Sequence, residues 1–313
     1  MITPLEITQL IQSKAIELGF TSMTVAKAEF MIPEAKRLEK WLHQGYHSGM
    51  HYMENHFEKR VDPTKLLPGT KTVISLSYNY FTFQKQKDPK APKISMYAYG
   101  KDYHTVVKGK LSILIEYIKS RFGDVSMRSF VDSAPILERD WARRSGHGWI
   151  GKNTLLIHPK RGSYFFLAEI LCDLEMHYDT PMKDYCGTCR KCIDACPTDA
   201  LSPLGYVLDS NKCISYLTIE HKGEIPLEHK SKMNGWIFGC DICQKVCPWN
   251  RFSAPHDESD FISSNGILDM TEKEWIELNE ETFHELFKYS AIKRTKYSGL
   301  NRNIKFSITN DAE

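Results

Sequence analysis

The sequence predicts an α+β protein in three parts: an N-terminal α/β domain over residues 1–180, a cysteine-rich module over 181–252, and a short helical segment over 253–313. Strand-like and helix-like segments alternate up to about residue 180, which is typical of layered α/β structure. Most of the nine cysteines fall in two tight clusters, and polar sequence of helical character follows them. A chain of 313 residues is long enough for such a division.

The first half of the N-terminal part contains two helical segments, a strand and a loop. Residues 5–18 predict an amphipathic helix, because their apolar residues recur on one side. Residues 34–55 are helical in composition, although they are rich in His and Tyr. The segment TVISLSYN at 72–79 predicts a strand, and FQKQKDPKAPK at 83–93 predicts a polar loop with Lys and Pro.

The second half adds one long helix and three strands. Residues 106–121 carry apolar residues at helical spacing, and strands are expected near 127–131, 154–158 and 164–171. The third part is mostly helical and polar around the segment WIELNEETFHELF. The sequence has no internal repeat and no low-complexity tract that would change this interpretation.

Composition is ordinary for a globular protein, with 42% hydrophobic and 26% charged residues. The net charge of +2 arises from 41 basic and 39 acidic residues, so overall charge indicates no particular partner. No stretch approaches the roughly 18 consecutive apolar residues of a membrane span. The N-terminus lacks the features of a secretory signal and a twin-arginine pair, so no membrane association and a cytoplasmic location are expected.

The first cysteine cluster has a diagnostic spacing. Cys186, Cys189, Cys192 and Cys196 follow the pattern C-x2-C-x2-C-x3-C, and Pro197 comes next. This run is typical of bacterial ferredoxins with two [4Fe–4S] clusters. Three closely spaced thiolates reach three corners of one cubane, whereas the fourth, next to proline, ligates the other cluster. The run therefore predicts two clusters.

The second cysteine cluster is one ligand short. Cys240, Cys243 and Cys247 align with the end of the same run, but Ile237 stands where the first cysteine is expected. Cys213, in the intervening segment, is the obvious replacement. The predicted ligand sets are Cys186, Cys189, Cys192 and Cys247 for one cluster, and Cys196, Cys213, Cys240 and Cys243 for the other.

Zinc is the competing interpretation, because C-x2-C pairs also suit zinc. Zinc would use two isolated pairs and would not require the Cys-Pro endings, so the pattern favours iron–sulfur clusters. The ninth cysteine, Cys172, lies in the apolar run FFLAEILC and is expected to be a buried core thiol. Clusters transfer single electrons and do little chemistry on organic substrates themselves, so the N-terminal part must explain where the electrons go.

Four segments outside or around the first run are dense in functional residue types: YAYGKDYH at 97–104, FVDSAPILER at 130–139, GHGWIGKNTLL at 146–156 and GCDICQKVCPWN at 239–250. With ISYLTIE at 214–220, and in this order, they resemble the epoxyqueuosine reductases. The resemblance runs from about residue 10 to about residue 305. One departure is length, because some members carry a further helical-repeat domain that this chain lacks.

The resemblance implies a reaction and its cofactors. Epoxyqueuosine lies at the wobble position of the tRNAs for Tyr, His, Asn and Asp, and its epoxide is reduced by two electrons to the alkene of queuosine. Electrons would pass through the two clusters to cobalamin, whose cobalt acts on the epoxide carbon. A ferredoxin or flavodoxin would be the external donor, the anticodon loop of tRNA would be the partner, and a monomer is expected.

Cobalamin is implied by the resemblance alone, but the sequence constrains how it would bind. Some B12 enzymes supply a histidine ligand to cobalt from an Asp-x-His-x-x-Gly motif. Asp102 and His104 begin such a motif here, but Val107 stands where the glycine should be. Cobalamin is therefore expected in its base-off form with no protein histidine below the cobalt.

Asp132, in the VDSAP segment, matches the family's proposed proton donor. An acid near the epoxide oxygen lowers the barrier to ring opening, and a donor carboxyl must stay protonated, which requires an apolar or crowded site. The flanking Phe130, Val131 and Ala134 fit that demand. The alternative is an aspartate that caps the following helix, since Asp-Ser-x-Pro is good capping sequence. His104 and Tyr103 are further candidates for the same pocket, or structural residues.

Cobalamin contacts are expected from several segments of the resemblance. Glycines around GHGWIGKN could allow close approach of backbone to a corrin, although such a set is weak evidence alone. The cofactor-binding candidates are Arg60, Met96, Asp132, Lys152, Asn153, His158, Ser215 and Asp241.

Two basic groups are candidates for tRNA contact. The segment at 292–305 has five basic residues and no acid, and a second group surrounds Arg143. Basic clusters with Tyr and Asn suit RNA phosphates, although a solvated basic face is the simpler interpretation. The tRNA-binding candidates are Arg143, Arg144, Lys293, Arg294, Lys296 and Arg302.

Two rival functions differ in class. A corrinoid reductive dehalogenase shares the cofactors and the order of domains, but those enzymes commonly carry a twin-arginine export signal. A pure electron carrier would need no large N-terminal domain, and here the domain has 180 residues dense in functional side chains.

Overall fold

The computed structural model describes residues 2–263 and 266–308. Its largest sheet has the strand order β1-β2-β7-β4, and each of its pairings is antiparallel. The strands are β1 (Ser22–Lys27), β2 (Thr72–Asn79), β7 (Phe165–Cys172) and β4 (Met127–Phe130). The α+β class is confirmed, as are the strands expected at 72–79, 127–131 and 164–171, whereas β1 was not predicted.

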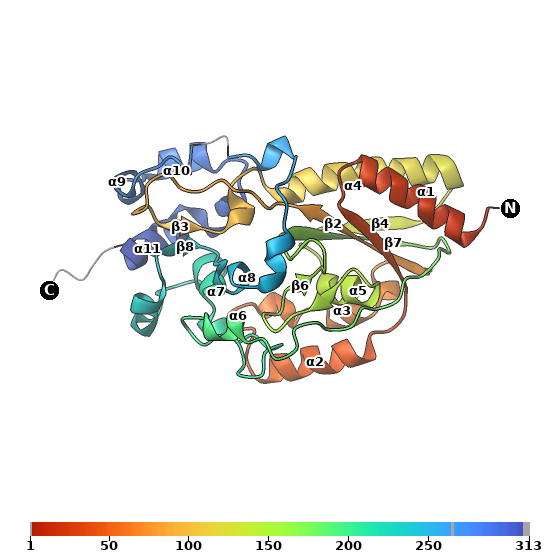
Figure 1. Ribbon diagram of the computed structural model, residues 1–313, viewed down its shortest axis with the longest axis horizontal. Coiled ribbons are helices and arrows are strands. Elements are labelled where there is room, and N and C mark those ends of the chain that lie inside the picture. The colour runs from red at the N-terminus through yellow and green to blue at the C-terminus, as the bar shows by residue number, and fades with distance from the viewer. Residues whose placement is uncertain (1, 264–265, 309–313) are drawn as a thin grey trace.

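Two helices cover one face of this sheet, α1 (Pro4–Glu17) and α4 (Tyr103–Phe122) (Figure 1). Both helices were predicted. A capping box starts α1, because the Thr3 hydroxyl accepts the Glu6 N–H at 3.3 Å and the Glu6 carboxylate accepts the Thr3 N–H at 2.7 Å. The two helices bury an apolar core against the sheet, which includes Ile11, Leu111, Leu114, Ile74 and Ile170.

The opposite face is covered by short helices (Figure 1). α5 (Glu138–Arg144) packs on β2 and β7, and α2 (Ile32–His43) and α3 (Phe57–Val61) lie on the same side. Their core is centred on Trp141, which is 1% exposed, with Met31, Val61, Val73 and Leu171 around it. The small hairpin of β5 (Trp149–Ile150) and β6 (Leu156–Ile157) follows α5.

The cysteine-rich part contains short helices that present the cysteines. They are α6 (Lys191–Asp194), α7 (Ile214–Ile219) and α8 (Ile242–Lys245). Strand β8 (Trp236–Phe238) pairs in parallel with β3 (Lys93–Ile94). This pairing joins the cysteine-rich part to a segment that lies far away in the N-terminal sequence.

The C-terminal part is helical, as predicted, in α9 (Glu272–Ile276), α10 (Glu280–Leu286) and α11 (Lys296–Ile308). It is less polar than expected, because it holds a core of its own around Trp275 and Phe287, both 0% exposed. Residues 91–99 pack into that same core. The division of the chain into three parts at residues 180 and 252 therefore stays a prediction, because this core contains residues from all three parts.

Short 3₁₀ helices connect the larger elements. They are η1 (His51–Met53), η2 (Pro63–Lys65), η3 (Met96–Ala98), η4 (Ser210–Lys212), η5 (Leu227–Lys232), η6 (Pro248–Phe252), η7 (Ser259–Phe261) and η8 (Ala291–Thr295). Within the described ranges, none of the helices combines the length and the apolar character that crossing a membrane would require.

Candidate active site and cluster ligands

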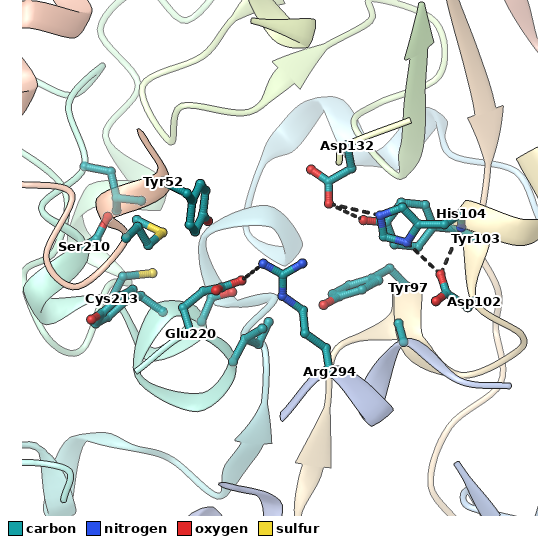
Figure 2. Close-up of a pocket in the computed structure, with 16 residues that line it drawn as sticks. Tyr52, Tyr97, Asp102, Tyr103, His104, Asp132, Ser210, Cys213, Glu220 and Arg294 are labelled. Carbon is teal, nitrogen blue, oxygen red and sulfur yellow. Dashed lines mark hydrogen bonds and ion pairs between the residues drawn. The ribbon is translucent and has the colours of Figure 1, made fainter. Parts of the chain in front are cut away.

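A cavity of about 290 Å³ opens where the three sequence parts meet. Figure 2 shows Asp132, Tyr103 and His104 on one side and Cys213 with Ser210 on the other, while Arg294 and Glu220 lie between them. The walls therefore combine titratable side chains from the N-terminal part with one of the cysteines. The cavity brings together elements from every part of the chain.

Asp132 is the centre of a hydrogen-bonded group on the first wall. Its Oδ2 accepts the Tyr103 hydroxyl at 2.6 Å and lies 3.5 Å from Nε2 of His104. The other ring nitrogen of His104 lies 2.7 Å from Asp102, which also caps the N-terminus of α4. Tyr103 is fixed by stacking on Phe166, with ring centroids 4.1 Å apart. The first turn of α4 thus aims two side chains at Asp132.

The backbone places Asp132 at a sharp turn after β4. Its φ of +55° lies in the left-handed region, which few non-glycine residues adopt. Its N–H donates to Glu138 Oε1 at 2.5 Å, and its side chain is 52% exposed. The capping interpretation is wrong, because the cap of α5 is Leu137 and the Asp132 carboxylate faces Tyr103 and His104 instead.

The charge of this group differs from the expected protonated acid. Desolvation raises the pKa of Asp132, but hydrogen bonds from His104 and Tyr103 and the charges of His104 and Arg294 outweigh it, so the pKa is lowered. The apolar neighbours do not protect a proton on Asp132, because Phe130 and Val131 are buried in the cores on either side of the sheet. Asp132 is therefore a carboxylate at neutral pH.

The protons reside on its neighbours. Desolvation lowers the pKa of His104, but the hydrogen bonds and charges of Asp102 and Asp132 raise it to about 9. Burial and the charge of Asp132 raise the pKa of Tyr103. At neutral pH the first wall thus holds a carboxylate between an imidazolium and a phenol, and a proton can reach Asp132 along either hydrogen bond.

The second wall carries Cys213 and Ser215 at the start of α7. Between the walls, Arg294 pairs with Glu220 at 2.6 Å. Burial and the charge of Glu220 raise the pKa of Tyr52, which also lines the cavity, to about 12. Arg294 was expected to contact tRNA from a surface segment, whereas the structure places it inside the cavity.

The eight predicted cluster ligands lie close together in space. Burial and the nearby thiols of Cys186 and Cys247 raise the pKa of Cys192 to about 11. In the other predicted set, burial with Cys213 and Cys196 raises the pKa of Cys240 to about 12. Burial and the nearby Cys186 and Cys189 raise the pKa of the Cys247 thiol, and burial with Cys213, Cys240, Cys196 and also Cys192 raises that of Cys243. All eight thiols therefore lie near one another, and their division into two ligand sets stays a prediction.

The spacing of the sulfur atoms fits a cluster better than a single ion. Four thiolates around one zinc ion, each about 2.3 Å from it, lie roughly 3.8 Å apart. Within residues 2–263 and 266–308, the one group of three or more His, Cys, Asp or Glu ligands within 4.8 Å of one another is His47, His51 and Glu54. The cysteines are free thiols, and among the described residues no three of their sulfur atoms lie within 4.8 Å of one another. Cys172 is buried at 1% exposure in β7, as expected.

Two of the eight cofactor-binding candidates, Asp132 and Ser215, line the cavity. Three others support the cysteine loops. Lys152 donates to the carbonyls of Gly187 at 2.7 Å and Cys189 at 3.0 Å, and Asn153 donates to the carbonyl of Cys243 at 3.2 Å.

Asp241, the third of these candidates, is 4% exposed and accepts the N–H of Met96 at 3.0 Å. Met96 Sδ accepts the Thr82 N–H at 3.4 Å. Arg60 is buried and donates to the carbonyl of Tyr52 at 2.6 Å, so it supports a cavity wall from behind. His158 interacts with Lys160 and Arg161 of its own turn. Cobalamin contact by these residues remains a prediction.

Four of the tRNA candidates are engaged within the protein. One is Arg294, which pairs with Glu220 at 2.6 Å and is half exposed. Arg144 donates to the buried Glu34 at 3.0 Å, and Arg143 pairs with the same carboxylate. Arg302 donates to the carbonyls of Gly223 at 2.7 Å and Leu217 at 3.0 Å. The exposed candidates are Lys293 and Lys296, next to Arg294. tRNA contact by this set stays a prediction.

Sequence reasoning missed two carboxyl groups beside the Asp132 turn. Glu138 lies in the FVDSAPILER segment, six residues after Asp132, but nothing in the pattern separates it from an ordinary first-turn glutamate. Glu169 is 0% exposed in the central strand β7. A single acid inside the apolar run FFLAEILC was a signal for it, because an unpaired buried carboxyl is costly and therefore rare.

Comparisons with known proteins agree on one family. Residues 60–133 match the family described as "Epoxyqueuosine reductase QueG", and residues 185–250 match "4Fe-4S double cluster binding domain". The chain is 53% identical over 299 residues to the epoxyqueuosine reductase of Cellulophaga algicola, covering 96% of this chain and 97% of the relative. It is also 53% identical over 296 residues to that of Leadbetterella byssophila, covering 95% and 96%.

Solved structures show the same similarity. The structure of epoxyqueuosine reductase from Streptococcus thermophilus has a TM-score of 0.87 and 30% identity, covering 97% of this chain and 81% of that chain. A crystal structure of epoxyqueuosine reductase with an epoxyqueuosine-modified tRNA-Tyr stem loop has a TM-score of 0.85 and 30% identity, covering 96% and 81%. A reductive dehalogenase shares the fold alone, at 17% identity and a TM-score of 0.52, covering 83% and 33%.

Proposed function

Because this chain belongs to the epoxyqueuosine reductase family, we propose that it reduces epoxyqueuosine to queuosine at the wobble position of the tRNAs for Tyr, His, Asn and Asp. The substrate takes up two electrons and two protons, its epoxide oxygen leaves as water, and an alkene forms. The observation that carries this proposal is the cavity, which has a cluster cysteine on one wall and proton-bearing groups around Asp132 on the other. The reaction needs both.

The eight cysteines hold two [4Fe–4S] clusters in the two sets defined above, matching the double-cluster family over residues 185–250. Cys213 lines the cavity, so the cluster that it ligates adjoins the substrate. The cluster of Cys186, Cys189, Cys192 and Cys247 is then the entry point for single electrons from a ferredoxin or flavodoxin. Lys152 supports that cluster by holding the loop carbonyls of Gly187 and Cys189.

The lining between the two walls would hold part of cobalamin, because the whole cofactor is larger than a cavity of about 290 Å³. Met50, Leu208 and Ile219 offer apolar contacts, and Ser215 offers a hydroxyl. His104 is the one imidazole among the described lining residues, and Asp102 and Asp132 engage it. That engagement supports base-off binding without a histidine ligand. When bound, cobalamin supplies the reducing metal centre for the epoxide carbon.

The first wall supplies the proton for the epoxide oxygen. Asp132 is placed to hand a proton from His104 or Tyr103 to the alkoxide that forms as the ring opens. Because His104 is protonated at neutral pH, the first wall already carries the proton before the substrate binds. Asp102 then stabilises the imidazolium from its other side.

The proposed partner is the anticodon loop of tRNA, with the modified base inserted into the cavity. Arg294 in the cavity and the exposed Lys293 and Lys296 beside it form a continuous basic edge for phosphates. We propose a monomer, since the cavity is built from one chain. The proposed location is the cytoplasm.

A single-turnover assay tests the function. The protein with both clusters and cobalamin, reduced chemically under anaerobic conditions, is mixed with epoxyqueuosine-containing tRNA, and the nucleosides are measured by mass spectrometry. We expect conversion to queuosine that depends on cobalamin. Absence of queuosine from fully loaded protein that still binds the tRNA would exclude the proposed reaction.

A further inference from the structure

Glu138 has an unusual position for a carboxyl group. It opens α5, and its Oε1 accepts the backbone N–H of Asp132 at 2.5 Å, so it spans the turn that carries Asp132. Asp132 adopts a left-handed backbone conformation there. Non-glycine residues keep that conformation when surrounding contacts hold it in place. The Glu138 hydrogen bond is such a contact, and it acts on the residue that faces the cavity.

Beneath Glu138 lies a second carboxyl group that the proposed reaction does not use. Glu169 is 0% exposed in β7, where its neighbours across the sheet are Ser75 of β2 and Phe130 of β4. No N–H or hydroxyl donor of the described residues reaches either of its carboxyl oxygens. Burial and the charge of the nearby Glu138 raise the pKa of Glu169, so Glu169 keeps its proton at neutral pH.

A proton on Glu138 explains how this carboxyl can lie so close to the Asp132 carboxylate. Burial and the charge of Asp132 raise the pKa of Glu138 to about 8, against the opposing effects of the Asp132 N–H, Glu169 and Arg139. Burial and Glu138 likewise raise the pKa of Glu169. A neutral Glu138 accepts the Asp132 N–H without repelling the Asp132 side chain.

We propose that Glu138 is a positioning residue: its carboxyl accepts the Asp132 N–H and holds the Asp132 turn so that the Asp132 side chain points into the cavity. The effect on catalysis rests on the proposed function. The fixing of the Asp132 turn by Glu138 is a property of the fold and does not depend on that function. Glu138 does not touch substrate. It acts through the backbone of Asp132.

The test compares two substitutions in the protein with its clusters and cobalamin. Glu138→Gln keeps an acceptor oxygen at the same reach, whereas Glu138→Ala removes it. We expect Glu138→Ala to lower the single-turnover rate roughly 10- to 100-fold, as expected for loss of a buried hydrogen bond that positions a reacting group, with tRNA affinity unchanged. Glu138→Gln should stay within about threefold of the parent rate. Glu116→Ala, an exposed glutamate of α4, is the matched control.

A second readout needs no turnover. Hydrogen–deuterium exchange of a peptide covering 130–137 should be faster in Glu138→Ala than in the parent and unchanged in Glu138→Gln. If Glu138→Ala does not load its clusters, Glu138→Asp replaces it, because the shorter side chain keeps the carboxyl but not the reach. The proposal would be overturned if Glu138→Gln had the same single-turnover rate and the same hydrogen–deuterium exchange as Glu138→Ala, or as Glu138→Asp where that variant replaces it. Loss of activity in the parent, with the exchange difference intact, would instead count against the proposed function.

Discussion

Asp132 works as a carboxylate among proton-bearing groups. Tyr103 and His104 donate to it, and Asp102 keeps His104 charged. This arrangement differs from a buried neutral acid, because the proton is stored on the neighbour and not on the donor itself. A carboxylate held in this way can accept a proton from His104 as it passes one to the substrate.

The Asp132→Asn variant tests this role. An amide cannot relay a proton, although it is nearly isosteric and can still accept the Tyr103 hydroxyl. We expect both clusters, cobalamin and tRNA to bind normally, while the single-turnover rate falls by about 10²- to 10⁴-fold. Turnover within a few-fold of the parent would remove Asp132 from the mechanism and leave His104 as the next candidate.

The carboxyl pair of Glu138 and Glu169 predicts a pH dependence of stability. Both pKa values are raised in the folded state, so the folded protein retains protons that the unfolded chain releases above about pH 4.5. The pair therefore lowers stability as pH rises from about 4.5 through about 8. His104 acts in the same direction, because its raised pKa means that its stabilising charge is lost as pH rises through about 9.

Glu169→Gln separates these two contributions. The neutral amide removes the titration of Glu169 but leaves Glu138, His104 and their partners in place. Between pH 6 and pH 9, the apparent unfolding temperature of the parent should fall by several degrees more than that of the variant, measured anaerobically with intact clusters. Parallel curves for the two proteins would show that the pair is ionised in the folded state at both pH values.

At the scale of elements, local patterns predicted the long helices and the buried strands. Strand β2 is buried over seven of its eight residues, and its apolar run was therefore unambiguous. Strand β1, Ser22–Lys27, was missed because its alternation is carried by Met, Val and Ala between small polar residues, a weak strand signal. Its place is set by pairing with β2, which local sequence does not reveal.

The basic residues of the segment at 292–305 have different structural roles. Arg302 of α11 donates to the carbonyls of Leu217, His221 and Gly223 around the end of α7, so it ties the C-terminal helix to the segment that begins with Cys213. Lys293 and Lys296 are exposed on the same basic stretch. Charge alone could not separate the two roles.

Paired variants distinguish these roles. Arg302→Ala should lower the apparent unfolding temperature, because three carbonyls, two of them in part-buried contacts, lose a charged donor. Lys293→Ala with Lys296→Ala should leave stability unchanged and weaken tRNA binding, and the salt dependence of affinity should flatten by up to about two units. Unchanged tRNA affinity in the double variant across a salt series would show that these lysines are ordinary solvated surface residues.

At the scale of the molecule, the cavity is a product of tertiary structure. The seven cysteines of the two motifs and Asp132 could be singled out because each lies in a compact segment with a recognisable pattern. Their roles as cluster ligands and proton donor stay predictions. The meeting of Cys213, Asp132 and Arg294 around one space could not, because these residues come from three distant segments. Of the eight cofactor candidates, two line the cavity, since residues such as Lys152 and Asn153 support the cysteine loops behind it.

The ligand set of the cluster beside the cavity is the sharpest test of the whole arrangement. Ile237 occupies the position at which a ferredoxin run would carry a cysteine, and it is 0% exposed in β8, where it packs in the core around Trp275 and Phe287. Cys213 instead approaches Cys196, Cys240 and Cys243 from the start of α7. The predicted ligand set of the second cluster therefore includes a residue outside both motifs.

Iron analysis follows from that geometry. The parent should contain about eight irons per chain, as two cubanes require. Cys213→Ala should retain about four, because Cys186, Cys189, Cys192 and Cys247 form a set that does not include it. Cys172→Ser should keep all eight, since that thiol is buried in β7 away from either set. Full iron content in Cys213→Ala would mean that another group completes the second cluster, and electrons would then not enter the cavity at Cys213.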